Sequence, residues 1–262
     1  MKISNGSIFK VQVPGMHRTW IVLVLFHFCF GTRADAQTNE QVWLEYMLNY
    51  PFANSWNLEN AVTMNTTTSS PKWRAYDYSA TLERDITQYV QIVAQGVLSY
   101  TNQTDSYNTL ELRPVLGTRF YLTPARRIQT RLLFRLEQRN LQDLDTKMWS
   151  QTWRPRARAE VIVPINQDSY YKDNLWYALI DAEWLFSNAD TDLKERFANR
   201  FRLRTGLGYR LNYSLRFEFI FMFQASRDGI DEDFSSSDNV FRFRLKHYLR
   251  KTKPSTGAGG TN

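Results

Sequence analysis

Long stretches of this chain alternate between apolar and polar residues with a period of two, and this constrains its fold more than any other feature. Residues 128–137 place Ile, Thr, Leu, Phe and Leu at even positions, and Gln, Arg, Leu, Arg and Glu at odd ones. Successive side chains of a strand point to opposite faces, so this pattern predicts a β-strand with one apolar and one charged face. A helical period is not found in these stretches.

Eleven segments of this kind follow one another along the chain. They lie approximately at residues 42–50, 55–64, 73–83, 89–100, 109–122, 127–138, 151–163, 175–186, 197–211, 214–225 and 239–249. Soluble strands average about five or six residues, whereas these are long enough to cross a membrane at a tilt. Their connections alternate between short and long, which is how an up-and-down membrane barrel is connected.

Two further features favour a membrane barrel. Tyr and Trp recur near the ends of the segments, as in the aromatic girdles of such barrels, for example Tyr50, Trp56, Trp153 and Trp184. Eleven apolar faces would also overfill the inside of a soluble barrel. We therefore expect an all-β, antiparallel up-and-down transmembrane β-barrel of 10–12 strands. Bacterial single-chain barrels have even strand numbers, so we favour twelve, with a further strand around 37–41 or one edge segment misassigned. A soluble secreted β-protein is the alternative.

The N-terminal residues have the pattern of an export signal. Lys2, Lys10 and Arg18 precede the apolar run Trp20–Phe30, and Ala34–Ala36 is a small-x-small cleavage site. We expect a cleaved signal peptide at 1–36, a barrel at 37–250 and a disordered tail at 251–262. A membrane anchor is the alternative, although the run is short for one, and Met16 is a second candidate start.

Removing the signal peptide also removes the lone cysteine, Cys29. Disulfides, thiol catalysis and cysteine zinc sites are thereby excluded from the mature chain. No cofactor motif and no nucleic-acid module is present, so we expect neither as a partner. The expected partners are outer-membrane lipid and, during biogenesis, the barrel-assembly machinery, with the protein located in the outer membrane.

The charged faces of the segments predict the contents of the lumen. Its basic rows are Arg154, Arg156, Arg158, Arg200, Arg202, Arg204, Arg242 and Arg244, and their acidic partners are Asp181, Glu183 and Glu218. Opposite charges on neighbouring strands contribute about 0.2 to 1 kcal/mol per pair. Lys and Arg outnumber Asp and Glu at the inward positions, and such a surplus favours anions in a water-filled pore. We expect a narrow, anion-leaning channel or a structural envelope component, because ten to twelve strands are too few for a wide pore.

An outer-membrane lipid-modifying enzyme is the competing function. Most such enzymes use a histidine beside a serine, and His247 is the one histidine left after removal of the signal peptide. Alternation places it on the lipid-facing side with Phe243 and Leu245, with no serine at a neighbouring facing position of the same segment. Asp181 and Glu183 could instead form a carboxylate pair, but flanking arginines should keep both ionised, which argues against a general acid. We therefore expect no catalytic residues.

The acidic segment between the last two strands is a candidate for binding a divalent cation through carboxylate oxygens. It contains Asp228, Asp231, Glu232, Asp233 and Asp238. Its spacing is not that of a calcium-binding loop. We expect an acidic, solvated loop and no metal.

Several stretches resemble one known family. They are Trp43–Tyr46 with Asn49–Phe52, Glu111–Pro114 with Gly117–Arg119, Arg135–Asn140, and Gly206–Leu211 leading into Leu215–Glu218. Over nearly the whole mature chain they resemble an uncharacterised outer-membrane barrel family of Bacteroidota-type bacteria, the domain of unknown function 2490. The resemblance implies fold and location, and it brings no catalytic residues. The chain departs from the common barrel pattern at its end, where Tyr248 is followed by Leu249 and a polar tail.

Overall fold

The structure of the chain is a computed structural model that describes residues 39–53, 55–68, 73–103, 108–124, 126–186, 199–227 and 235–249. The expected signal peptide (1–36) and tail (251–262) lie outside these residues, as do Asp228, Asp231, Glu232 and Asp233 of the acidic loop. Among the described residues, no helix is long and apolar enough to cross a membrane.

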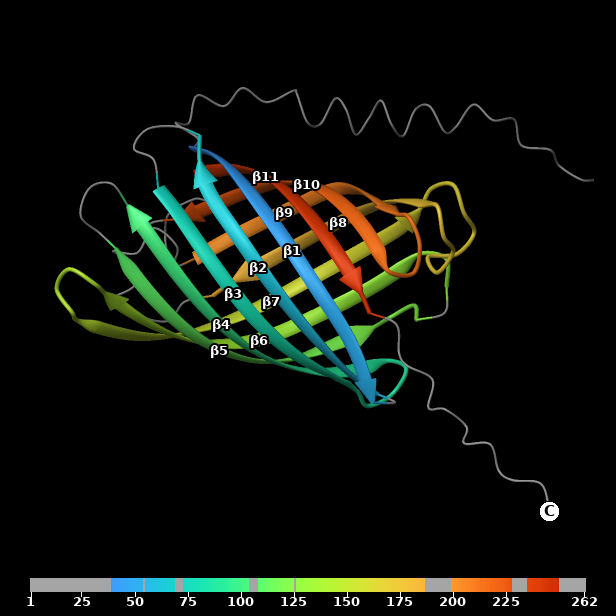
Figure 1. The fold of residues 1–262 in the computed structure, drawn as a ribbon, viewed down its shortest axis with the longest axis horizontal. Helices are drawn as coiled ribbons and strands as arrows, with labels where there is room; N and C mark the ends of the chain where they lie inside the picture. The colour runs from blue at the N-terminus through green and yellow to red at the C-terminus, as the bar shows by residue number, and fades with distance from the viewer. Residues whose placement is uncertain are drawn as a thin grey trace, which may run out of the picture. The chain divides into compact units, whose positions relative to one another are not determined.

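The described residues form eleven β-strands and each overlaps one of the eleven expected segments. They are β1 (Asn39–Ala53), β2 (Trp56–Thr67), β3 (Trp73–Asp85), β4 (Val90–Gln103), β5 (Thr109–Tyr121), β6 (Gln129–Asp143), β7 (Trp149–Pro164), β8 (Leu175–Leu185), β9 (Asn199–Arg210), β10 (Leu215–Arg227) and β11 (Ser235–Tyr248). Each pairs with its neighbours in sequence, and β1 pairs with β11 to close a barrel (Figure 1). The expected all-β barrel of 10–12 strands is confirmed.

The barrel closes through a parallel pair, whereas every other pair is antiparallel. The parallel register runs from Asn39 opposite Asp238 to Asn49 opposite Tyr248. The described strands number eleven instead of the favoured twelve, because residues 39–41 begin β1 and form no strand of their own. Strand direction alternates along the chain, so the first and eleventh strands must run the same way. As a consequence, residues 39 and 249 lie at opposite ends of the barrel (Figure 1).

The two ends of the barrel differ in their connections. At one end, here named the turn end, β1 ends and β2 begins, and the described residues 86–89, 122–124, 126–128, 165–174 and 211–214 lie there. At the other, the loop end, β2 ends and β3 begins, and the described residues 144–148 lie there. By the strand bounds, the connections 122–128 and 165–174 at the turn end are seven and ten residues long, whereas 144–148 at the loop end is five, so the expected alternation of short and long connections is present only in part.

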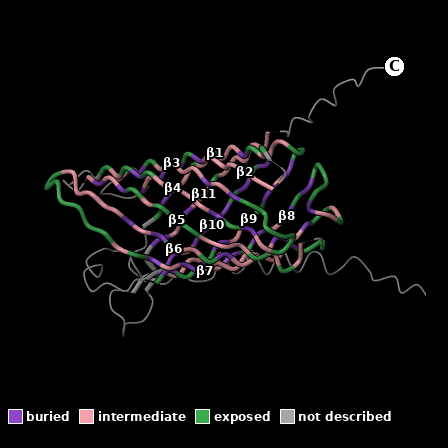
Figure 2. Tube along the Cα trace, turned by 90° about the horizontal axis from the view of Figure 1, so that it is seen from below, coloured by how far each residue is buried: buried purple, intermediate pink, exposed green. Residues whose placement is uncertain are grey.

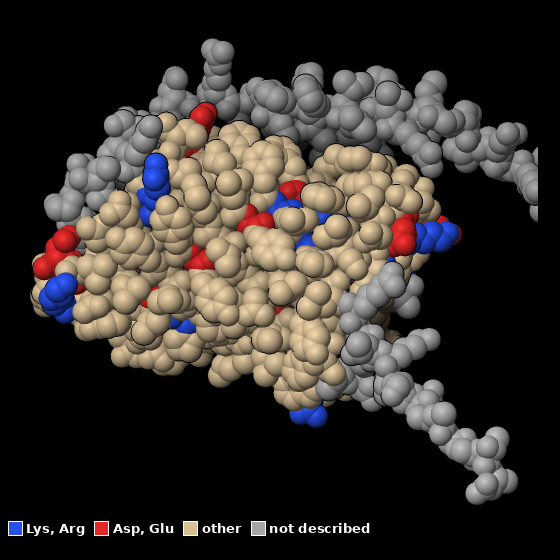
Figure 3. Space-filling model, viewed as in Figure 1, with Lys and Arg blue, Asp and Glu red and all other residues tan. Residues whose placement is uncertain are grey.

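The barrel wall is apolar outside and polar inside. Burial alternates residue by residue along the strands, as Figure 2 shows and as β8 does over its full length. Charged residues at outward-facing strand positions are confined, in the described part, to Glu40, Arg74 and Arg84, all near strand ends. Figure 3 shows one side of the outer surface of the barrel, where most of the described side chains are uncharged. The charged side chains of the strands thus gather in the lumen.

Candidate functional site in the barrel lumen

The lumen has two walls of different composition. The inward positions of β1–β4, here named the arginine-free wall, carry acids but no Lys or Arg. The inward positions of β5–β11 form the arginine wall. Its described cationic side chains are Arg113, Arg119, Arg131, Arg135, Arg139, Arg154, Arg156, Arg158, Arg202, Arg204, Arg210, Arg216, Arg242, Arg244 and Lys246. Arg200 lies on β9 opposite Leu185, but its side chain is outside the described part.

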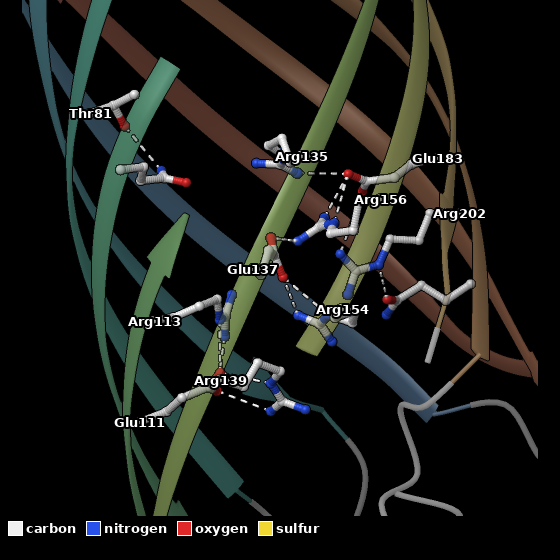
Figure 4. A network of polar contacts seen from close by, with 12 residues as sticks. Thr81, Glu111, Arg113, Arg135, Glu137, Arg139, Arg154, Arg156, Glu183 and Arg202 are labelled. Atoms are coloured by element: carbon white, nitrogen blue, oxygen red, sulfur yellow. Dashed lines mark hydrogen bonds and ion pairs between the residues drawn. The ribbon is translucent and has the colours of Figure 1, made fainter. Parts of the chain in front are cut away.

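Glu183 of β8 is the most heavily paired carboxylate of the arginine wall. Its side chain is 0% exposed and forms ion pairs with Arg156 at 2.6 Å, Arg135 at 2.8 Å and Arg204 at 3.1 Å, with Arg202 at 3.7 Å. These guanidiniums come from β6, β7 and β9, so they converge from both sides of β8 (Figure 4). The expected arrangement, in which basic rows flank the strand that carries Glu183, is what the register shows.

Asp181, the second expected acid of β8, pairs with a single cation. Nε of Arg204 lies 2.6 Å from its carboxylate, and the same guanidinium reaches Glu183 through Nη2. Arg204 thereby ties the two acids together. Two of the expected basic groups do not pair with the acids of β8: Arg154 pairs with Glu137 of β6, and Arg158 pairs with Glu160 of its own strand. The side chain of Arg200 lies outside the described part.

Two acids that sequence reasoning did not select complete this network. Glu137 of β6 is 1% exposed, and its carboxylate forms ion pairs with Nη2 of Arg154 at 2.8 Å and with Nη1 of Arg156 at 2.5 Å (Figure 4). Glu160 of β7 pairs with Arg158 of its own strand and with Arg131 of β6, each at 2.5 Å. The signal was present in the sequence, because both acids share the inward parity of the arginine rows.

A second network ties the arginine wall to β1 across the parallel closure. Glu218 of β10 pairs with Lys246 at 2.8 Å and Arg244 at 2.9 Å, both from β11. Arg244 also pairs with Glu45 of β1, which Arg242 approaches at 3.4 Å. The expected proximity of the β11 row to Glu218 is therefore observed. Glu45 was not selected because parallel closure could not be read from the sequence.

An apolar cluster lies in the lumen toward the turn end. It consists of Ile162, Tyr170, Leu175, Tyr177, Leu179 and Ile220. Tyr177 is fully buried and donates a hydrogen bond from its hydroxyl to Glu218 at 2.7 Å. Gly208 makes room for it, since a Cβ atom there would overlap the Tyr177 ring. Tyr170 comes from the connection 165–174, and its ring lies edge-on to Tyr177.

His247 faces outward, as alternation predicts, beside the parallel closure. Its Nδ1 is hydrogen-bonded to the hydroxyl of Tyr46 at 3.0 Å. Its backbone partners on β1 and β10 are Leu48 and Leu215. The described residues thus place a tyrosine and leucines around His247, and no serine is hydrogen-bonded to it.

The acidic loop offers little structure to assess as a metal site. Asp238 is its one described member, and it is buried and accepts a hydrogen bond from Gln224 at 3.4 Å. Among the described residues, no group of three or more His, Cys, Asp or Glu side chains could hold a metal ion.

Fold and lumen together define a class of protein, a closed β-barrel with an apolar outer face and a salt-bridged interior. Residues 40–235 match the family described as "Protein of unknown function (DUF2490)". The match covers most of the chain, so the chain belongs to this family, and the resemblance seen in the sequence is confirmed. No curated protein matches the chain. The family description assigns no role to any residue.

Proposed function

We propose that this chain is an outer-membrane β-barrel whose lumen is a narrow, anion-leaning passage. The observation that carries the proposal is the arginine wall. Inward cations outnumber inward acids, and all the described inward cations lie on β5–β11, with no Lys or Arg at the inward positions of β1–β4. Arginine is always ionised at physiological pH, so this positive potential does not depend on the protonation of any neighbour.

The membrane location is supported by the outer face. Exposed side chains there include Leu116, Phe134, Trp153 and Phe219, and the charged residues described on this face lie near strand ends. Lipid is a suitable surrounding for such a surface, whereas water is not. The export signal expected at residues 1–36 is consistent with delivery to the envelope, where barrel-assembly machinery and membrane lipid would be partners.

The anion preference is supported by the charge balance around the carboxylates. Glu183, Glu137 and Glu160 each pair with two or more guanidiniums, so the cations are not matched one to one. A fixed excess of positive charge in a pore repels cations and attracts anions. The narrowness is supported by side chains that reach over an intervening strand, such as Arg135 of β6 to Glu183 of β8 at 2.8 Å.

Single-channel recording of the mature protein in a planar bilayer under a KCl gradient tests this proposal. We expect small steady currents and a reversal potential of the sign that marks chloride preference. Arg242→Gln should move the reversal potential toward zero, because Arg242 lies in the lumen and is only loosely paired with Glu45. The matched control Arg84→Gln changes an arginine on the outer face and should leave the potential unchanged.

Two results would contradict the proposal. Cation preference would mean that the arginine wall does not set the field along the path. Absence of current after confirmed insertion would mean that the salt bridges and the turn-end cluster close the lumen, which leaves a structural role in the envelope.

A further inference from the structure

We infer that the turn end of the lumen is a binding site for a phosphate-type anion, formed by Arg210, Arg216 and Lys246 and covered by Tyr170. The inference goes beyond ion passage, because binding requires no current through the barrel. It rests on a row of cations with few counter-charges, on buried donors without acceptors, and on the oxygen atoms that these cations contact.

Three cations lie side by side at the turn end of the lumen. Arg210 of β9 is directly opposite Arg216 of β10, which is directly opposite Lys246 of β11. Like charges directly opposite one another on neighbouring strands destabilise a sheet. Elsewhere on the arginine wall a shared carboxylate, such as Glu183, separates the guanidiniums. This row is therefore a place where a bound anion would stabilise the barrel.

The row has few counter-charges of its own. Lys246 pairs with Glu218 at 2.8 Å, and Arg210 meets the exposed side chain of Asp173 only at 3.5 Å. Arg216 has no ion pair among the described residues. Arg210 and Arg216 are both nine-tenths or more buried. Their Nε atoms are buried too and have no hydrogen-bond acceptor among the described residues. Buried donors without acceptors are costly, and a ligand could satisfy them.

Tyr170 supplies neutral oxygen atoms to this pair of arginines. Nη1 of Arg216 donates to the Tyr170 hydroxyl at 2.7 Å, and Nη1 of Arg210 donates to the Tyr170 carbonyl oxygen at 3.2 Å. The guanidinium of Arg216 also lies over the rings of Tyr170 and Tyr248, at 5.1 and 4.3 Å. Tyr170 thus covers the two arginines and offers them two neutral hydrogen-bond acceptors. The charged oxygen atoms of an anion would bind the same guanidiniums more strongly than these neutral acceptors do.

The connection that carries Tyr170 is held at its base, which positions this cover. The side chain of Asn166 donates to the carbonyl oxygen of Asn174 at 2.8 Å, and the amide of Trp176 donates to Asn166 at 2.8 Å. Asn174 has a φ of 52°, a conformation that asparagine tolerates better than most residues. Because 165–174 lies at the turn end, we expect the anion to enter from there.

The local charge balance selects the class of anion. The row and the groups connected to it by ion pairs comprise five cations and three acids: Arg210, Arg216, Lys246, Arg242 and Arg244 against Glu45, Glu218 and Asp173. This leaves a surplus of two positive charges. A phosphate group carries about 1.5 to 2 negative charges at neutral pH, whereas a carboxylate carries one. A guanidinium also binds two oxygen atoms of one phosphate group at once, through two parallel hydrogen bonds. Inorganic phosphate or a phosphate monoester is therefore the class of anion that matches this site.

Isothermal titration calorimetry of the full folded chain in detergent tests the inference, with inorganic phosphate and glycerol 3-phosphate as probes and acetate at equal ionic strength as the reference. We expect saturable phosphate binding in a one-to-one ratio. Arg216→Gln should weaken it by about 10-fold or more, since a charged hydrogen-bond donor is lost. Lys172→Gln is the matched control: it removes an exposed cation, paired with Asp168, from the connection that carries Tyr170, and it should leave phosphate binding unchanged.

Tyr170→Phe provides an independent test that does not remove a charge. It keeps the ring but frees Nη1 of Arg216, so phosphate should bind about 2- to 10-fold more tightly. Heat-modifiable gel mobility verifies that each variant is folded, and Tyr170→Phe decides the matter if Arg216→Gln does not fold. Equal heats for acetate and phosphate, no saturable binding, or an unchanged affinity in Tyr170→Phe would overturn the inference. Binding of glycerol 3-phosphate as well as phosphate would support it and extend the class to monoesters.

Discussion

The two walls of the lumen stabilise one barrel by different interior chemistry. On the arginine wall the contacts are ion pairs around almost fully buried carboxylates, of which Glu183 is 0% and Glu137 1% exposed. On the arginine-free wall they are largely hydrogen bonds between neutral or singly charged groups, such as Asn65 to Asp77 at 2.8 Å and Gln95 to Thr81 at 3.0 Å. A buried charge requires a partner, whereas a neutral hydrogen bond contributes only about 0.5 to 1.5 kcal/mol. Disruption should therefore cost far more on the arginine wall.

The walls are complementary where they meet. At one junction Arg119 of β5 pairs with Glu83 of β3 at 2.8 Å, over the intervening β4. At the other junction Arg242 and Arg244 of β11 pair with Glu45 of β1. The acids of the arginine-free wall thus supply counter-charge to the opposite wall. This arrangement explains how one wall can hold every inward arginine in a closed barrel.

The largest expected effect is from Glu183→Gln. The variant keeps the shape of the side chain but leaves the guanidiniums of Arg135, Arg156 and Arg204 around a neutral amide. Removing one partner from a buried ion pair costs about 3 to 5 kcal/mol. Asp77→Asn, the matched change on the arginine-free wall, should cost about 1 kcal/mol, because its partners Asn65 and Ser99 are neutral. Urea titration of the folded barrel in lipid vesicles measures both free energies of unfolding.

Equal losses in Glu183→Gln and Asp77→Asn would remove the distinction between the walls. That outcome would mean that water in the lumen screens the ion pairs of Glu183 as it screens those of a protein surface.

A smaller effect is expected from Gly208→Ala on the arginine wall. The added Cβ would overlap Tyr177, which must then shift and weaken its hydrogen bond to Glu218. Overpacking of this kind costs about 1 to 3 kcal/mol. Gly96→Ala on β4 is the control, since no atom lies within 4 Å of the added Cβ there. Thermal unfolding should separate the two variants, and an equal melting temperature would show that Tyr177 has room to move.

The local part of this fold could be predicted from the sequence. Alternation identifies every described strand and the face of the arginines that the structure describes on those strands, because the period of two is fixed by backbone geometry. It also places the arginine rows that contain Arg156 and Arg204 on the two strands that flank Glu183, since consecutive strands pair. These inferences use only neighbours along the chain.

The remaining features depend on contacts between distant strands. Parallel closure, the pairing of Glu45 with Arg244, and the reach of Arg135 past β7 all depend on which strands meet across the barrel. Tyr170 was missed for a different reason, because it lies in a connection where alternation carries no information. A long, flexible arginine side chain can reach several acids. Alternation therefore predicts that an arginine points into the lumen, but not which acid it pairs with there.

The smallest expected effect is from Glu59→Gln, which tests whether an acid on the arginine-free wall can lack a partner. Glu59 faces inward from β2, opposite Thr81, and makes no hydrogen bond or ion pair among the described residues. We expect the free energy of unfolding to change by less than about 0.5 kcal/mol.

Glu45→Gln on the same wall is the control for Glu59→Gln, and it should destabilise the barrel clearly, because it leaves Arg244 with one acid fewer. Glu59→Gln should also make the passage slightly more anion-selective, since it removes a negative charge without freeing a guanidinium. A loss of stability as large as that in Glu45→Gln would show that Glu59 does neutralise an arginine of the opposite wall. The two walls would then differ in where their arginines lie in the sequence, but not in how much their acids contribute to the free energy of unfolding.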